Sequence, residues 1–168
     1  ANRMSAEGIS MFYGANNVKT TLAEIYTGIE KYATIAQFKN KDKLYLLDLS
    51  KVIHLKIPSL FDRKNRYKRR FIGFFKKFVN EIISPIDNVP AIEYVPTQIL
   101  TEYFRHVYQY GCMVDGIIYP SSKNPRGKCY ALFFNSEQCV TGKNQRLVME
   151  PKTVRTYRIL NNIKYEEV

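Results

Sequence analysis

The sequence predicts an α+β fold, with about three helices packed on a mixed or antiparallel sheet. Three observations support this class. Hydrophobic residues make up 45% of the 168 residues and aromatic residues 14%, which is too apolar for a disordered chain. Apolar residues recur at helical spacing in the first two thirds. The last third is a series of short strand-like runs between turns. The length suits a single domain over residues 1–168 with its own core.

The first elements form a strand, a turn and a helix. The apolar run Ile9–Tyr13 predicts a strand, which Gly14 to Asn17 should end. A helix is expected from Thr20 to about Lys31, because the apolar residues fall on one face. Two strands should follow, at Tyr32–Lys39 and Lys43–Ser50.

Two longer helices and several strands complete the expected fold. The second helix should span Tyr67–Ile83, with a core face that includes Phe71 and Phe74, and Ser84-Pro85 should end it. A Pro-marked loop over 85–96 leads to a third helix. The expected later elements are a helix at Thr97–Tyr108, with Tyr103 and Val107 in its core face, and strands at Gly116–Ser121, Cys129–Asn135, Arg146–Glu150, Thr153–Leu160 and Ile163–Glu167.

Charge and cysteine content restrict the classes of partner. The net charge is +11, from 26 basic and 15 acidic residues. This charge favours a polyanionic binding partner, such as nucleic acid or a phosphorylated molecule. Three cysteines without a CxxC pair suit a reduced, cytoplasmic protein. No apolar run reaches the length of a membrane span, so we expect no membrane partner. Two isolated histidines and scattered carboxylates show no metal-ligand spacing, so no metal is expected.

Glu24 is the first candidate for chemistry. Thr21-Leu22-Ala23-Glu24 fits the S/T-x-x-E capping box, in which the carboxylate only caps the helix. Taken alone, the capping interpretation is favoured. The alternative is a carboxylate at the start of a helix that opens into a pocket.

Ser121 and Ser122 are the second candidates, at the exit of the strand in "DGIIYPSSKNPRGKCYALFF" (115–134). A nucleophilic serine would need a histidine base, but His54 and His106 both lie in apolar-periodic stretches and G-x-S-x-G is absent. These hydroxyls should therefore bind a substrate or form a turn. The third candidate, the basic run Arg63–Arg70, is either an RNA-binding surface or, as we favour, a solvated loop.

Several separated motifs resemble the RES domain, a family named for an arginine, a glutamate and a serine. The motifs are Arg3, the run Gly8–Tyr13, Thr21 to Glu24, "EYVPTQILTEYFR" (93–105) and "DGIIYPSSKNPRGKCYALF" (115–133). The resemblance implies a fold similar to the diphtheria-toxin-like ADP-ribosyltransferases. It also implies a toxin that degrades NAD⁺ by hydrolysis or phosphorolysis, with a protein antitoxin as partner. The long middle segment resembles the form that follows a HEPN-type domain, so we expect an upstream segment or domain.

The resemblance assigns roles to individual residues. Arg3 matches the family arginine, Tyr13 a pocket tyrosine, Glu24 the glutamate and Ser121 the serine, with Ser122 as second choice. Glu24 would stabilise the positive charge that develops on the ribose. Arg3 would hold the pyrophosphate, Tyr13 would stack on nicotinamide beside the small Gly14 and Ala15, and Ser121 would orient ribose or phosphate. Family members often carry asparagine at the position of Cys129.

Two other functions stay open at this stage. The same chemistry could transfer ADP-ribose to a macromolecule, which would make the protein an ADP-ribosyltransferase. The basic surface could instead belong to a non-catalytic nucleic-acid-binding module. NAD⁺ is expected as the substrate of the NAD⁺-degrading enzyme and of the ADP-ribosyltransferase, but not of the nucleic-acid-binding module.

Overall fold

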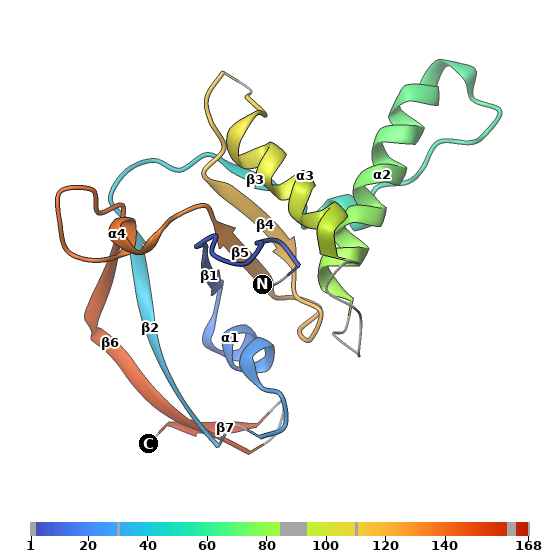
Figure 1. Ribbon diagram of the computed structural model, residues 1–168. Helices are drawn as coiled ribbons and strands as arrows, with labels where there is room; N and C mark the ends of the chain where they lie inside the picture. The colour runs from blue at the N-terminus through green and yellow to red at the C-terminus, as the bar shows by residue number, and fades with distance from the viewer. Residues whose placement is uncertain (1–2, 30, 85–93, 110, 161–163, 168) are drawn as a thin grey trace.

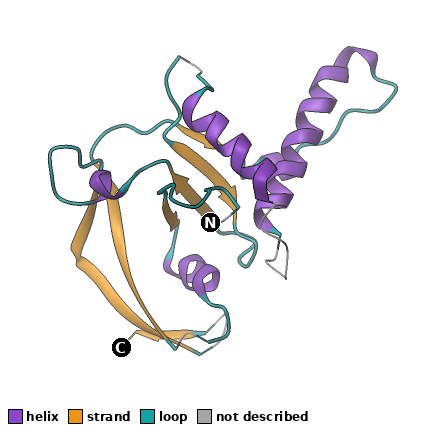
Figure 2. Ribbon diagram, viewed as in Figure 1, coloured by secondary structure: helices purple, strands orange, loops and turns teal. Residues whose placement is uncertain are grey.

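The described residues form two sheets and three main helices. The computed structural model describes residues 3–29, 31–84, 94–109, 111–160 and 164–167. One sheet has four strands in the order β1-β5-β4-β3, and the other has three in the order β2-β6-β7 (Figure 1). Helices and strands mix along the chain, as Figure 2 shows by colour. The α+β class with mixed and antiparallel sheets is therefore confirmed.

The four-stranded sheet carries the main core. Its antiparallel strands are β1 (Phe12–Ala15), β5 (Lys128–Leu132) and β4 (Gly116–Pro120), and β3 (Leu46–Asp48) pairs with β4 in parallel. The chain crosses from β3 to β4 through α2 (Arg66–Ile83) and α3 (Val95–His106). These helices bury one face of the sheet, where Val79, Ile117 and Ala131 are fully buried. This parallel crossover explains why the two long helices lie together on one face.

The three-stranded sheet packs against the first helix. Its strands are β2 (Tyr32–Asn40), β6 (Leu147–Ile159) and β7 (Tyr165–Glu167), all antiparallel. Helix α1 (Val18–Ile25) buries Leu22 against Tyr157 and Ile159. The remaining short elements are η1 (Val52–His54), η2 (Arg63–Asn65) and α4 (Ser136–Cys139).

Three sequence-based boundaries were wrong, each for a local reason. Helix α1 ends at Ile25 because Tyr26 is extended and Gly28 has a φ of 102°, which no helix accepts. Gly14 continues β1 instead of ending it. The strands expected at 146–150 and 153–160 are one strand, β6, whose pairing with β2 shifts between Ile35 and Gln37. There the Thr153 hydroxyl accepts the Gln37 N–H at 2.9 Å, so the irregularity leaves that donor paired.

Other expectations were partly correct or lie outside the described residues. The second helix starts and ends within one residue of its expected bounds, whereas the strand expected at Ile163–Glu167 is observed only as β7. Much of the loop expected over 85–96, at 85–93, and the first residue of that strand lie outside the described residues. The four-residue helix α4 was not predicted. Its Asn135 and Gln138 form a reciprocal capping box.

The core faces of α2 and α3 also differ from the prediction. Phe71 and Phe74 are half exposed, because the first half of α2 projects beyond α3 (Figure 1). Tyr103 is also half exposed, and Val107 is 61% exposed just past the end of α3, so neither belongs to the core face that was expected. In their place, α3 buries Thr97 and Thr101. Periodicity of apolar residues misses these threonines, whose hydroxyls donate to backbone carbonyls and so satisfy their polar groups on burial. No helix in the described ranges is long and apolar enough to cross a membrane.

Candidate active site

Helix α1 is capped by a residue other than the one that the sequence indicated. The side chain of Asn17 accepts the Thr20 N–H at 2.8 Å and the Thr20 hydroxyl at 2.9 Å. Thr21 lies inside the helix, and Glu24 lies in its last turn. The capping-box interpretation of Glu24 is therefore wrong, because a preceding asparagine already supplies the N-cap. The Glu24 carboxylate takes no part in capping.

The Glu24 carboxylate is instead hydrogen-bonded to Ser121. The Ser121 hydroxyl, just past the end of β4, donates a hydrogen bond to Oε1 of Glu24. The same hydroxyl oxygen accepts the backbone N–H groups of Lys123 and Asn124, at 3.2 and 2.9 Å. Both acceptor positions of the hydroxyl are occupied, and its proton points at the carboxylate. This geometry orients Ser121 as a donor and disfavours its use as a nucleophile.

The loop 121–127 is joined to α1 at both ends of the helix. Lys123 Nζ donates to the carbonyls of Glu24 and Tyr26 at 3.3 and 2.6 Å, which places a cation at the C-terminus of the helix. Asn124 Nδ2 donates to Thr20 Oγ1 at 2.8 Å near the other end. A Cβ on Gly127 would lie 2.5 Å from that same oxygen, so only glycine allows this approach. These contacts fix the position of Glu24 relative to Ser121.

Side chains on one face of the four-stranded sheet extend the site beyond Glu24 and Ser121. Cys129 of β5 lies opposite Ala15 of β1 and Tyr119 of β4, while Tyr13 lies opposite Ala131. Because residues alternate between faces, Tyr13, Ala15, Cys129 and Tyr119 share a face, and Gly14 lies on the other. Of the two small residues expected beside the nicotinamide, only Ala15 therefore shares the face of Tyr13.

Burial near Glu24 keeps two groups neutral. Burial raises the pKa of Tyr119 well above its usual range, and the charges of Cys129, Tyr13 and Glu24 add to the effect. Burial likewise raises the pKa of Cys129 to about 12, with a contribution from the Glu24 carboxylate, which accepts a hydrogen bond from the thiol. Cys129 is thus a protonated donor to Glu24 and no thiolate nucleophile at neutral pH.

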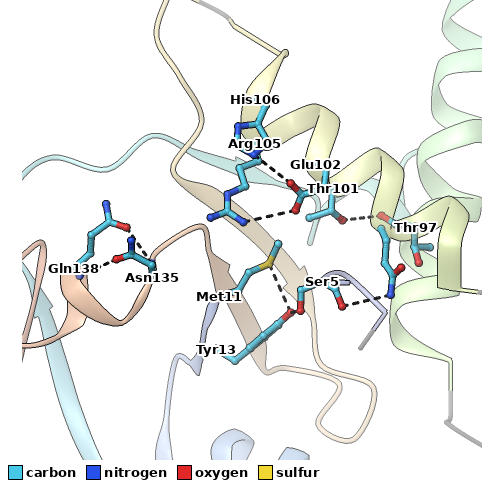
Figure 3. Close-up of polar contacts among 11 residues, drawn as sticks. Ser5, Met11, Tyr13, Thr97, Thr101, Glu102, Arg105, His106, Asn135 and Gln138 are labelled. Carbon is cyan, nitrogen blue, oxygen red and sulfur yellow. Dashed lines mark hydrogen bonds and ion pairs between the residues drawn. The ribbon is translucent and has the colours of Figure 1, made fainter. Parts of the chain in front are cut away.

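Tyr13 lies at the open edge of this face. Its side chain is 40% exposed. Its hydroxyl contacts the Ser5 hydroxyl and the Met11 sulfur (Figure 3), at 3.5 and 3.7 Å. The segment before β1 thus holds the far end of the ring in place, and much of the ring is accessible.

The comparisons with known proteins give one match. The family model of the RES domain matches residues 1–153 of the chain. The chain belongs to the RES domain family. No curated protein sequence and no solved structure matches it.

Three residues were matched to the arginine, glutamate and serine for which the family is named, and the structure joins two of them directly. Glu24 and Ser121 are bonded, whereas Ser122 is exposed. Arg3 lies between two helices: Nη1 donates to the carbonyl of Glu81, and the guanidinium lies 5.3 Å from the Tyr94 ring centroid. Its own carbonyl accepts the Thr97 hydroxyl at 2.5 Å. These contacts anchor the start of the RES domain to α2 and α3.

Several residues at the site were missed by reasoning from the sequence. Lys123 and Asn124 position the loop, and Cys129 of β5 donates to Glu24; all three lie in the quoted stretch 115–133, but nothing in that stretch assigns these contacts to them. On α3, Glu102 Oε1 lies 3.6 Å from Arg105 Nη1, and His106 Nε2 lies 3.2 Å from the other carboxylate oxygen (Figure 3). Within the described ranges, no group of three histidine, cysteine, aspartate or glutamate residues could hold a metal ion.

Proposed function

We propose that this RES domain consumes NAD⁺ by cleaving the bond between nicotinamide and ribose, through hydrolysis or phosphorolysis. One observation carries the proposal: in a chain of this family, a serine hydroxyl held by two backbone N–H groups donates to the Glu24 carboxylate and orients it. A fixed carboxylate is the group that such a cleavage requires.

Glu24 is assigned the central role. When the bond breaks, its electron pair leaves with the nicotinamide nitrogen and positive charge develops on C1′ and the ring oxygen of the ribose. A preorganised carboxylate beside that sugar stabilises the charge without reorganising during the reaction. Water or phosphate then adds to C1′, and with water the proton leaves to solvent. The products are nicotinamide and either ADP-ribose or its phosphate.

Ser121 is assigned to orientation. Its hydroxyl is held by two backbone N–H groups and donates to Glu24, so it fixes the direction of the carboxylate. It would also lie next to a sugar bound by Glu24. The occupied lone pairs support a role without a covalent serine intermediate.

Tyr13 and Arg3 are assigned to substrate binding. The exposed part of the Tyr13 ring is accessible for stacking on nicotinamide. Arg3 would supply a fixed positive charge for the pyrophosphate, a group that guanidinium binds in a bidentate manner. Its contacts with the Glu81 carbonyl and the Tyr94 ring would hold it at a constant position.

The test is to incubate the protein with NAD⁺ and to measure free nicotinamide by chromatography. We expect nicotinamide release, and a parallel reaction with inorganic phosphate identifies the acceptor by the mass of the ADP-ribose product. If NAD⁺ stays intact with and without phosphate, the proposal fails. If nicotinamide is released but the ADP-ribose is recovered on the protein or on an added macromolecule, the transferase alternative replaces it.

A further inference from the structure

The excess positive charge of the protein is concentrated in one projecting segment. Residues 51–77, which we call the arm, comprise η1, the loop after it, η2 and the first two thirds of α2. The arm contains ten basic residues and one acidic residue, so it holds nine of the eleven excess positive charges. Its outer part projects away from the body of the protein (Figure 1). The remainder of the chain is close to neutral.

Acidic groups of the protein neutralise few of the basic side chains of the arm. In the described part of the chain, its only ion pair joins Lys77 to Glu81, 3.8 Å apart and exposed. The single acidic residue, Asp62, is occupied as the cap of η2, where it accepts the N–H of Asn65. Arg69 donates to the carbonyl of Pro58 at 2.9 Å and so ties the loop to α2. The charge therefore faces solvent on an ordered scaffold.

Aromatic rings lie among these charges. Phe61 is 88% exposed and Tyr67 is 80% exposed, far above what a folded core would leave. Tyr67, Phe71 and Phe74 follow at spacings of four and three residues, so they share one edge of α2. Arg70 and Lys77 lie three residues beyond Tyr67 and Phe74, next to that edge.

The rings form the open end of an aromatic ladder. Tyr67 stacks on Phe71 with a centroid distance of 6.3 Å, Phe71 contacts Phe75 at 4.6 Å, and Phe75 contacts Phe104 of α3 at 6.1 Å. The inner rings, Phe75 and Phe104, are buried in the core, whereas Phe71 is half exposed and Tyr67 is mostly exposed. The ladder thus ends on the surface with the ring that has the greatest exposure in the helix.

We propose that the arm binds single-stranded nucleic acid. Arginine and lysine contact the phosphates, and exposed rings stack on unpaired bases, which is the combination that single strands require. Duplex bases are already stacked and do not reach the rings. A second copy of this chain is disfavoured as the occupant, because it would bring two arms with nine excess charges each into contact. The site is separate from Glu24 and does not rest on the proposed reaction.

The charge component is tested by salt dependence. A labelled oligouridine of about 12 nucleotides serves as the probe, and binding is measured by fluorescence anisotropy over a range of salt concentrations. Replacing Arg63, Arg66 and Arg70 by Gln should lower the slope of log affinity against log salt by about 2. A triple variant with Lys39, Lys41 and Lys143 replaced by Gln removes equal charge elsewhere and should bind as the parent does.

The stacking component is tested by a change that keeps apolar character. Phe61→Leu and Tyr67→Leu remove the π face only, and each should weaken oligouridine binding by about 5- to 150-fold. Leu60→Ser removes exposed apolar surface without a ring and should leave that binding unchanged. Far-UV circular dichroism should be the same for all variants.

Three results would overturn the proposal. One is the absence of oligouridine binding by the parent at low salt. Another is equal affinity for a duplex of the same length. The third is a combined result with vesicles of equal parts phosphatidylcholine and phosphatidylglycerol. In that result Leu60→Ser abolishes vesicle binding, Phe61→Leu and Tyr67→Leu retain it, and none of the three variants changes the affinity for oligouridine. That pattern would assign the arm to an anionic membrane surface.

Discussion

The Ser121 hydroxyl donates to the Glu24 carboxylate across 97 positions of sequence. This bond joins the last turn of α1 to the exit of β4, and it fixes the orientation of the one carboxylate that we assign to catalysis. Its two partners respond to substitution in different ways, because Glu24 carries the charge and Ser121 only directs it.

Glu24→Gln should abolish NAD⁺ turnover and leave the fold intact. Glutamine still accepts the Ser121 hydroxyl through its amide oxygen, so the free energy of unfolding should change by no more than about 1 kcal/mol. Loss of the negative charge should cost more than about 3 kcal/mol of transition-state stabilisation. Nicotinamide release and urea denaturation measure the two effects. Glu7→Gln, at an exposed position, is the control and should match the parent; equal turnover in both variants would remove Glu24 from the mechanism.

Ser121→Ala should slow NAD⁺ turnover by an amount equivalent to about 1–3 kcal/mol, because two backbone N–H groups and the Glu24 carboxylate lose their partner. Ser122→Ala is the matched control, one residue further on and exposed, and should have no effect. Intact-mass spectrometry during turnover should find no adduct on the protein. An ADP-ribosylated Ser121 would show that the serine is a nucleophile after all.

Alkaline pH should destabilise the protein through Cys129. Its pKa rises from 9.0 to about 12 on folding. Between these values the unfolded chain has lost the proton and the folded chain keeps it, so the stabilisation present below pH 9 declines as pH rises. In Cys129→Ala this contribution is absent, and the free energy of unfolding should fall less steeply between neutral and alkaline pH. Urea denaturation under reducing conditions measures the two slopes; identical slopes would contradict the prediction.

Gly127→Ala should destabilise the protein by about 1–3 kcal/mol. The new methyl group would lie 2.5 Å from Thr20 Oγ1 and 2.6 Å from Thr20 Cγ2, and Thr20 is fully buried and bonded to Asn17 and Asn124. Gly73→Ala is the contrasting variant, because nothing lies within 4 Å of its added Cβ. Within helix α2 it should stabilise by about 0.5–1 kcal/mol. Thermal denaturation of the two variants should therefore shift in opposite directions.

The elements that the sequence predicted well are those with a strong local pattern. Helix α2 has a continuous apolar face, and Ser84-Pro85 ends it, so both its bounds were near the observed ones. The pattern could not show that α3 covers only part of that face, and Phe71 was therefore assigned to the core. The long strand β6 was divided between Glu150 and Thr153, because no local rule indicates that a threonine hydroxyl can replace a ladder acceptor across the irregularity.

At the site, the sequence identified the residue types and the structure supplied their relation. Glu24 and Ser121 came from the resemblance to the RES domain, and their contact depends on a loop that is tied to both ends of α1. The capping box at Thr21 failed because the pattern occurs one turn inside a helix that begins earlier. The protonated state of Cys129 follows from burial beside a carboxylate, which a lone cysteine in a sequence does not reveal.

The pairings of β1 with β5 and of β2 with β6 have a consequence for synthesis of the chain. Tyr13 pairs with Ala131, and Tyr32 pairs with Arg158, so β1 and β2 are each translated long before their partner strands. Such distant pairings fold slowly. At about 5–20 residues per second, the ribosome spends on the order of 10 s on a chain that has Glu24 but lacks Ser121. An activity that depends on both residues is therefore absent from the nascent chain until Ser121 has been translated.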